Sequence, residues 1–153
     1  MLKSSTSEEM IATVMHEFID AVNKRDVERA ASYFQDDATW QTAEGTFKGK
    51  SEIKRYLTWV NQIVQNSKIT ETGIRLLVKG NTAVYESDQG GTYKGKEYSV
   101  RTICIHEFNG EKFQNVRTIH DRLDILKQTV SAEGWFARRA VNSIINTAEK
   151  GLH

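Results

Sequence analysis

The fold class is decided by two long alternating runs, KEYSVRTICIHEFNGEKFQNVRTIHDRL (residues 96–123), which meet at Asn109-Gly110. Polar and apolar residues alternate on both sides of this dipeptide, as expected for strands with one buried face. Asn-Gly favours a tight turn because both residues tolerate positive φ. The segment therefore predicts a β-hairpin. The Leu-x-x-Leu spacing after His120 predicts that the chain then leaves the sheet as a helix.

Patterns with a helical period come first in the chain, and patterns with a strand period follow. Apolar residues recur at helical spacing in residues 5–26, 27–34 and 50–66. Residues 68–81 and 82–91 then alternate with a period of two and are separated by Gly-Asn, which is a turn signal. Helices gathered before strands predict an α+β fold with a mostly antiparallel sheet covered on one face.

The C-terminal segment, residues 131–152, is predicted to be an amphipathic helix. Its apolar half could cover a pocket as a lid, pack on a dimer partner or bind another protein. Packing within the chain or on a dimer partner is the simplest interpretation. Glu149 lies among the basic residues of the polar half, which argues against binding to anionic lipid.

Composition excludes several classes of protein. A chain of 153 residues is most simply one domain, spanning residues 1–153 with a core of about 8–128. The net charge of +1 gives no field that would attract nucleic acid. The single cysteine, Cys104, cannot form an internal disulfide and is typical of a reducing compartment. No apolar run approaches the ~18 residues of a membrane span. We therefore expect a cytoplasmic protein with no membrane partner.

No metal site is predicted, because the four histidines are scattered without ligand spacing and there is no Cys-x-x-Cys. The glycine pairs lack the strand–glycine–helix context of a phosphate site. We expect no organic cofactor either.

Three segments together resemble a known family. They are FIDAVNKRDVERAASYFQDDATW, GTFKGKSEIKRYL and GKEYSVRTICIHEFNGEKFQNVRTIHDRLDILKQ, which cover much of residues 8–128. Their order and spacing are similar to those of the SnoaL-like proteins in the nuclear-transport-factor-2-like superfamily, which includes ketosteroid isomerase and polyketide cyclases. The resemblance implies a cone: a strongly curved sheet packed on three N-terminal helices around an apolar pocket. Dimers are common in this superfamily, whose activities vary widely.

The resemblance also implies a site. Related isomerases place a pocket acid on the strand position that matches Cys104, so alternation puts Tyr98, Val100, Thr102, Cys104 and His106 on the pocket side. A turn centred on Asn109-Gly110 would put the following residues opposite them on the same face: Phe113, Asn115, Arg117, Ile119 and Asp121. Asp121 matches the acid/base aspartate of SnoaL-like cyclases. His120 would then point outward, away from Asp121.

A ketosteroid-isomerase mechanism is disfavoured, because its base, tyrosine and acid would fall at Thr42, Phe18 and Cys104. We instead expect a cofactor-free acid/base enzyme of cyclase, isomerase or hydratase type that acts on an apolar carbonyl or cyclic metabolite. Its catalytic residues would be Asp121, Tyr98 and Arg117. The residues expected to line the pocket are Phe18, Trp40, Thr42, Tyr56, Trp59, Glu86, Val100, Thr102, Cys104, Asn115 and Ile119.

Each candidate also has a structural interpretation. Asp121 could cap the helix that follows the strand, and Arg117 could pair with a buried acid such as Glu86. The aromatic residues could form core rather than pocket, and Gly90-Gly91 could be a bulge that leaves the direction of Glu86 open. The alternative function is a non-catalytic binding or dimerisation module. A homodimer would use the open sheet face, which is expected to carry Arg101, Ile103, Ile105, Val116 and Thr118.

Overall fold

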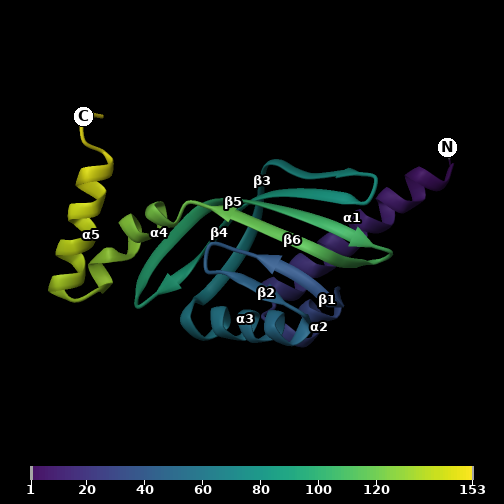
Figure 1. The fold of residues 1–153 in the computed structure, drawn as a ribbon, viewed down its shortest axis with the longest axis horizontal. Coiled ribbons are helices and arrows are strands. Elements are labelled where there is room, and N and C mark those ends of the chain that lie inside the picture. The colour runs from purple at the N-terminus through teal and green to yellow at the C-terminus, as the bar shows by residue number, and fades with distance from the viewer. Residues whose placement is uncertain (1, 153) are drawn as a thin grey trace.

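The computed structural model describes the backbone of residues 2–152 and the side chains of residues 7–152 (Figure 1). The predicted domain bounds therefore include Met1 and His153, which lie outside the described residues. The helices are α1 (Leu2–Asn23), α2 (Val27–Ser32), α3 (Lys50–Ile63), α4 (Arg122–Thr129), the 3-10 turn η1 (Val130–Ala132) and α5 (Trp135–Ala148). The strands are β1 (Phe34–Gln41), β2 (Thr46–Lys48), β3 (Gln65–Lys79), β4 (Thr82–Tyr93), β5 (Lys96–Asn109) and β6 (Lys112–His120).

The six strands form one sheet in the order β2-β1-β6-β5-β4-β3. All neighbours are antiparallel except β1 and β6, which run parallel. The long strands curve around α1, α2 and α3 (Figure 1). The predicted α+β class with a mostly antiparallel, curved sheet and helices on one face is confirmed.

Aromatic side chains fill one end of the space between helices and sheet. Phe18 of α1 contacts Phe113 of β6 with ring centroids 4.9 Å apart, and Phe34 of β1 lies 5.1 Å from Phe113. Trp40 stacks on Phe34 at 5.4 Å. Edge-to-face and stacked aromatic contacts of this kind add to the free energy gained from burying the rings. We call this aromatic cluster the closed end of the cone.

The β5–β6 hairpin is confirmed, but its register differs from the predicted one. Asn109 pairs with Lys112, so the turn consists of Gly110 and Glu111, and only Gly110 has positive φ (+65°) among these residues. The pairs Phe108–Phe113 and Glu107–Asn115 leave Gln114 as an extra, bulged residue. One extra residue exchanges the two faces of a strand. All of β6 after Gln114 is therefore turned over relative to the sequence-based expectation.

The amphipathic helix α5 is present but does not pack as expected. It protrudes from the domain beyond α4 (Figure 1), and Phe136 and Ile144 are 82% and 62% exposed. Its contacts within the chain are with α4 and η1. Within the chain the apolar half is covered only in part, at Val141 and Ile145, and packing on a dimer partner stays a prediction. Within residues 2–152, no helix is both long and apolar enough to cross a membrane.

Candidate functional site

A cavity of about 340 Å³ lies at the end of the cone opposite the aromatic cluster. Its walls are α3 on one side, α4 and η1 on the other, and the inner face of β4, β5 and β6 between them. Most of its lining is apolar or aromatic, as is usual in small-molecule sites. It is lined by Glu44, Tyr56, Trp59, Val60, Ile63, Val64, Gln89, Tyr93, Tyr98, Val100, His120, Arg122, Ile125, Leu126, Thr129, Val130, Glu133 and Val141.

The polar groups of the cavity include His120, Glu44 and Tyr56. The His120 side chain is only 9% exposed, and both of its ring nitrogens are buried without a hydrogen-bond partner. Its Nε2 lies 3.8 Å from Glu44 Oε1. The Tyr56 hydroxyl donates to the other carboxylate oxygen, Oε2, at 3.1 Å. A buried polar group without a partner is rare in folded proteins, so the imidazole is available to a ligand.

Backbone geometry places these three side chains. Glu44 lies in the turn between β1 and β2, where its backbone N–H donates to Thr42 Oγ1 at 3.1 Å. Tyr56 points from the middle of α3 and stacks on Phe47 of β2, with centroids 4.3 Å apart. His120 is the last residue of β6 and pairs with Thr102 across the sheet. The cluster therefore joins a hairpin turn, a helix and a strand end.

Two tyrosine hydroxyls remain protonated donors beside Glu44. Burial, and then the negative charge of Glu44, raise the pKa of Tyr56 well above its usual range. The same two causes raise the pKa of Tyr98, which is on β5. Both phenols therefore keep their protons at neutral pH: Tyr56 uses its proton in the hydrogen bond to Glu44, and Tyr98 can donate its own to a ligand oxygen.

Side chains attach the α4 wall to the sheet. β6 ends at His120, so at Ser99 the side of β5 that faces away from β4 has no neighbouring strand. The Gln128 amide replaces that strand: its Oε1 accepts from Ser99 N–H at 2.9 Å, and its Nε2 donates to Ser99 C=O at 2.9 Å. Lys94 and Glu133 add an ion pair of 2.9 Å between the β4–β5 turn and the residue after η1. The wall is therefore held at two points.

On β5 the predicted face is the observed one. Val100, Thr102 and Cys104 are buried on the inner side, but only Val100 lines the cavity, so the predicted lining roles of Thr102 and Cys104 are wrong. Burial raises the pKa of the Cys104 thiol to about 11, so it stays protonated and is no nucleophile. Tyr98, Tyr56 and Trp59 line the cavity as expected.

Three further predicted lining residues, Phe18, Trp40 and Thr42, belong to other parts of the structure. Phe18 and Trp40 are core residues of the closed end. The Trp40 indole donates to Thr118 Oγ1 at 2.9 Å. Thr42 is buried and shapes the turn that carries Glu44. None of the three contributes to the lining of the cavity.

The predicted directions of Asp121, Arg117, Asn115 and Ile119 are wrong, because the bulge at Gln114 turns β6 over. Asp121 is exposed and caps α4, accepting the backbone N–H groups of Leu123 and Asp124 at 2.8 and 3.2 Å. Arg117 and Asn115 bond Glu107 on the open sheet face, where Ile119 is 58% exposed. By the same shift, Val116 and Thr118 face inward rather than outward.

Glu86 also faces away from the cone, and so does Asp88. Both carboxylates bind Arg101, at 3.0 and 2.7 Å, on the open sheet face. Glu86 also accepts the Ile74 backbone N–H at 2.8 Å. These contacts hold the pKa of Glu86 below its usual range. Its predicted place in the pocket lining is wrong.

His120 and Glu44 are the site residues that sequence reasoning missed. His120 was expected to face outward, and a bulge in β6 has no glycine or proline signal that would reveal it. Glu44 lies in a turn that contains a glycine, and the sequence of this turn has no feature that distinguishes it from an ordinary loop. Among residues 7–152, no group of three or more His, Cys, Asp or Glu side chains is arranged to hold a metal ion.

Comparison with solved structures agrees with this fold. A protein with a ketosteroid-isomerase-like fold from Catenulispora acidiphila, in complex with trimethylamine, is 19% identical with a TM-score of 0.70, covering 75% of this chain and 90% of that one. TerC co-crystallised with polyporic acid is 16% identical with a TM-score of 0.70, covering 78% and 97%. A candidate SnoaL-like polyketide cyclase from Shewanella denitrificans is 13% identical with a TM-score of 0.71, covering 79% and 97%.

At these identities the likeness shows the fold and no more. A comparison with curated protein sequences finds no match. The model of the SnoaL-like domain, however, matches residues 15–116, which are two thirds of the 153 residues. Together with the cone and its apolar cavity, this match establishes that the chain belongs to the SnoaL-like family.

Proposed function

We propose that this protein binds an apolar carbonyl compound in its cavity and catalyses proton transfer with His120 as the acid/base. The observation that carries the proposal is the His120 imidazole, which is nine-tenths buried, has no partner on either nitrogen and lies 3.8 Å from Glu44. Histidine is the side chain best suited to take up and release a proton near neutral pH. The proposal moves the reacting group from Asp121 to its neighbour.

The surrounding residues support each step of such a reaction. His120 would remove a proton from the carbon beside a carbonyl group, and the electron pair left behind would shift to the carbonyl oxygen. The hydroxyl of Tyr98 is the donor available to stabilise that negative charge, because the Tyr56 hydroxyl already donates to Glu44. Glu44 would orient the imidazole and stabilise its protonated form. Return of the proton to another atom of the enolate completes an isomerisation, with no cofactor required.

The cavity suits a cyclic or aromatic ligand. Tyr56 and Trp59 stack with centroids 6.1 Å apart and present a flat wall opposite the aliphatic residues of α4. TerC, which has a similar fold, was co-crystallised with polyporic acid. That compound is therefore a reasonable binding probe here. Trp59 lines the cavity and provides a fluorescence signal for binding.

The chemical test is deuterium exchange. The probe is 2-tetralone, a bicyclic ketone with exchangeable hydrogens beside its carbonyl, and its exchange in D2O is followed by NMR. The protein should accelerate exchange over buffer, and His120→Gln should reduce the protein-dependent rate by about 10²–10⁴-fold. Glu44→Gln should reduce it less, because Glu44 acts through the imidazole.

Asp121→Asn is the matched control, since it changes the neighbouring ionisable residue on the same strand end. Exchange that is unaffected by His120→Gln, or that is lost in Asp121→Asn, would contradict the assignment. If polyporic acid changes the Trp59 fluorescence but the protein does not accelerate the exchange of 2-tetralone, the result would favour the alternative function, a non-catalytic binding module.

We also propose a homodimer through the open sheet face. Ile103 and Ile119 pair across β5 and β6 and are 40% and 58% exposed there. The charges around them are paired within the chain, Arg101 with Glu86 and Asp88 and Arg117 with Glu107, which leaves an apolar centre. Light scattering should show a dimer that Ile119→Glu dissociates, whereas a wild-type monomer at micromolar concentration would refute it.

A further inference from the structure

Helix α5 exposes an apolar stripe that the rest of the chain does not cover. Phe136, Ala140 and Ile144 follow one another at i, i+4 and i+8 and therefore share one face of the helix. All three are exposed, Phe136 to 82%. The partly covered edge of the helix is a different one, formed by Val141, Ile145 and Glu149. An exposed stripe of this kind on a protruding helix marks a binding surface.

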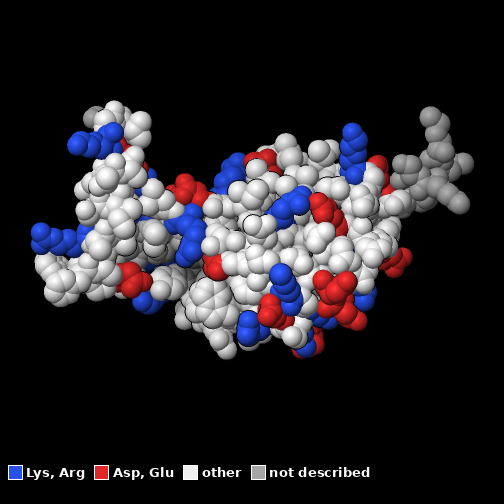
Figure 2. Space-filling view, viewed as in Figure 1, with Lys and Arg blue, Asp and Glu red and all other residues white. Residues whose placement is uncertain are grey.

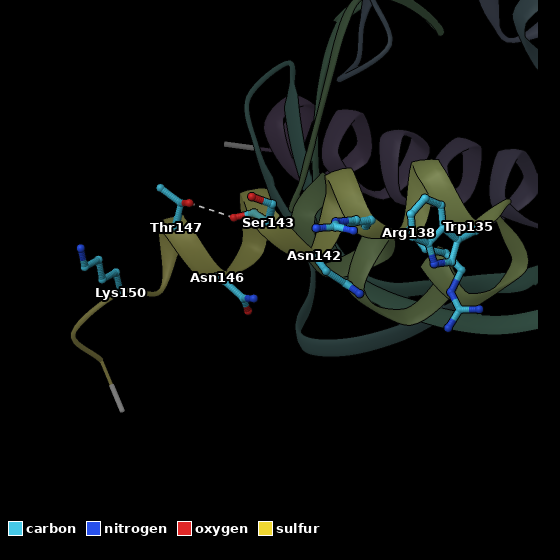
Figure 3. A pocket seen from close by; sticks show the side chains of 8 residues that line it. Trp135, Arg138, Asn142, Ser143, Asn146, Thr147 and Lys150 are labelled. Atoms are coloured by element: carbon cyan, nitrogen blue, oxygen red, sulfur yellow. Dashed lines mark hydrogen bonds between the residues drawn. The ribbon is translucent and has the colours of Figure 1, made fainter.

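The opposite face of α5 is cationic and rich in hydrogen-bond donors. Figure 3 shows Arg138, Asn142 and Asn146 projecting from this helix and Lys150 from the turn that follows it, so the hollow that they line is open rather than enclosed. Arg139 belongs to the same face and lies over the ring of Trp135, 5.5 Å from its centroid. Guanidinium, ammonium and amide groups are the donors that bind phosphate oxygens.

The one acid of the helix end does not neutralise these cations. Glu149 is paired with Lys127 of α4. Among residues 7–152, Arg138, Arg139 and Lys150 form no ion pair. Figure 2 shows blue side chains near both ends of the protruding helix, while red and blue are interspersed over the rest of the visible face. Because Glu149 is already paired with Lys127, it does not oppose binding of these cations to anionic lipid.

We propose that α5 binds, lying flat, to the surface of an anionic phospholipid bilayer. The stripe of Phe136, Ala140 and Ile144 would enter the boundary between headgroups and acyl chains, and the arginines and Lys150 would contact lipid phosphates. An apolar stripe opposite a cationic face, with an aromatic pair at one end, is the arrangement found in interfacial helices. Here Trp135 and Phe136 form that pair, with ring centroids 4.7 Å apart.

The positive charge of the α5 segment favours an anionic lipid surface over a second copy of this helix as the binding partner. Two α5 helices packed through their apolar stripes would leave Arg138, Arg139 and Lys150 of each copy on the outer faces, where nothing in the complex would pair with them. An anionic surface instead attracts each cation. Because Val141 lines the cavity as well, binding through α5 would place the cavity rim next to the bilayer, where apolar metabolites dissolve.

The test is co-sedimentation of the full chain with sucrose-loaded vesicles of phosphatidylcholine alone and of phosphatidylcholine with 30% phosphatidylglycerol. We expect binding to the anionic vesicles that weakens with added salt, and much weaker binding to the neutral ones. The double change Phe136→Ser with Ile144→Ser should reduce partitioning at least about tenfold. Arg138→Gln with Arg139→Gln should reduce it about fivefold for each charge removed.

Ile74→Ser with Leu77→Ser is the matched control, because it removes two similarly exposed aliphatic side chains from β3, away from the centre of the proposed dimer interface, and should leave vesicle binding unchanged. Circular dichroism checks that the variants are folded. The proposal is overturned if the wild type does not bind anionic vesicles, or if the α5 and control variants bind equally. It is also overturned if Phe136→Ser with Ile144→Ser dissociates a dimer in light scattering while no vesicle binding is seen.

Discussion

Two buried histidines, His106 and His120, face the same side of the same sheet, yet their surroundings differ. His106 of β5 lies at the closed end, 1% exposed, with its ring 4.7 Å from that of Phe113 and 5.9 Å from that of Phe18. His120 of β6 lies at the other end and faces a cavity beside Glu44. Strand alternation puts a side chain on the inner face, but the neighbouring side chains decide whether it is core or site.

The largest expected effect on stability comes from removing a buried aromatic ring at the closed end. Phe113 is fully buried and contacts Phe18, Phe34, Phe108 and His106. Phe113→Ala should lower the free energy of unfolding by about 3–5 kcal/mol, because it removes buried area and leaves a cavity. Tyr98→Phe at the cavity end should cost far less. Urea unfolding measures both, and equal losses would show that the two ends are packed alike.

The acid stability of the closed end depends on His106. Burial lowers the pKa of His106 to about 3 from 6.5. Below about pH 6.5 the unfolded chain binds a proton on this imidazole and the folded chain does not, so acid favours unfolding by ~1.4 kcal/mol per pH unit. Stability should therefore fall as the pH drops from 6.5 towards 3.

His106→Leu should remove this part of the pH dependence, leaving only the contribution of the carboxylates. The measurement is the free energy of unfolding in urea at pH 7, 6, 5 and 4, compared between the two proteins. Parallel curves for wild type and His106→Leu would refute the assignment of a neutral, buried imidazole.

At the cavity end, loss of the single side-chain amide of Gln128 should weaken the attachment of the α4 wall to the sheet. Gln128→Ala removes both hydrogen bonds to Ser99 and should destabilise the wall by about 1–2 kcal/mol. Hydrogen exchange at the Ser99 amide should accelerate, while amides at the closed end remain protected. Gln128→Glu keeps the acceptor for Ser99 N–H and loses the donor, so it should protect that amide better than alanine does.

The smallest effect is expected at Asp121. Asparagine caps helices as well as aspartate does, so Asp121→Asn should leave the unfolding midpoint and polyporic acid binding almost unchanged. Asp121→Ala should destabilise α4 measurably, because Leu123 and Asp124 lose the acceptor of their backbone N–H groups. A loss of ligand binding in Asp121→Asn would show that this carboxylate belongs to the cavity after all.

The local patterns of the sequence determined the fold class. Alternation around Asn109-Gly110 and helical spacing in the segments that became α1 and α3 are both confirmed. On β5 the family resemblance assigned Cys104 to the inner face and alternation extended that face to its neighbours, and Val100, Thr102 and Cys104 are indeed interior. These features depend on neighbours within a few residues, and such short-range preferences can be read directly.

The site depended on tertiary structure. A bulge at Gln114 turned β6 over, exchanging Arg117 and Asp121 for Thr118 and His120 on the inner face. Bulges follow from how a strand fits its neighbours, and no local residue pattern required this one. Glu44 and His120 are 76 residues apart in the sequence, but they lie close together because β1 and β6 run side by side in the sheet. The sequence by itself determined which segments form strands and helices, whereas only long-range packing decided which side chains meet in the cavity.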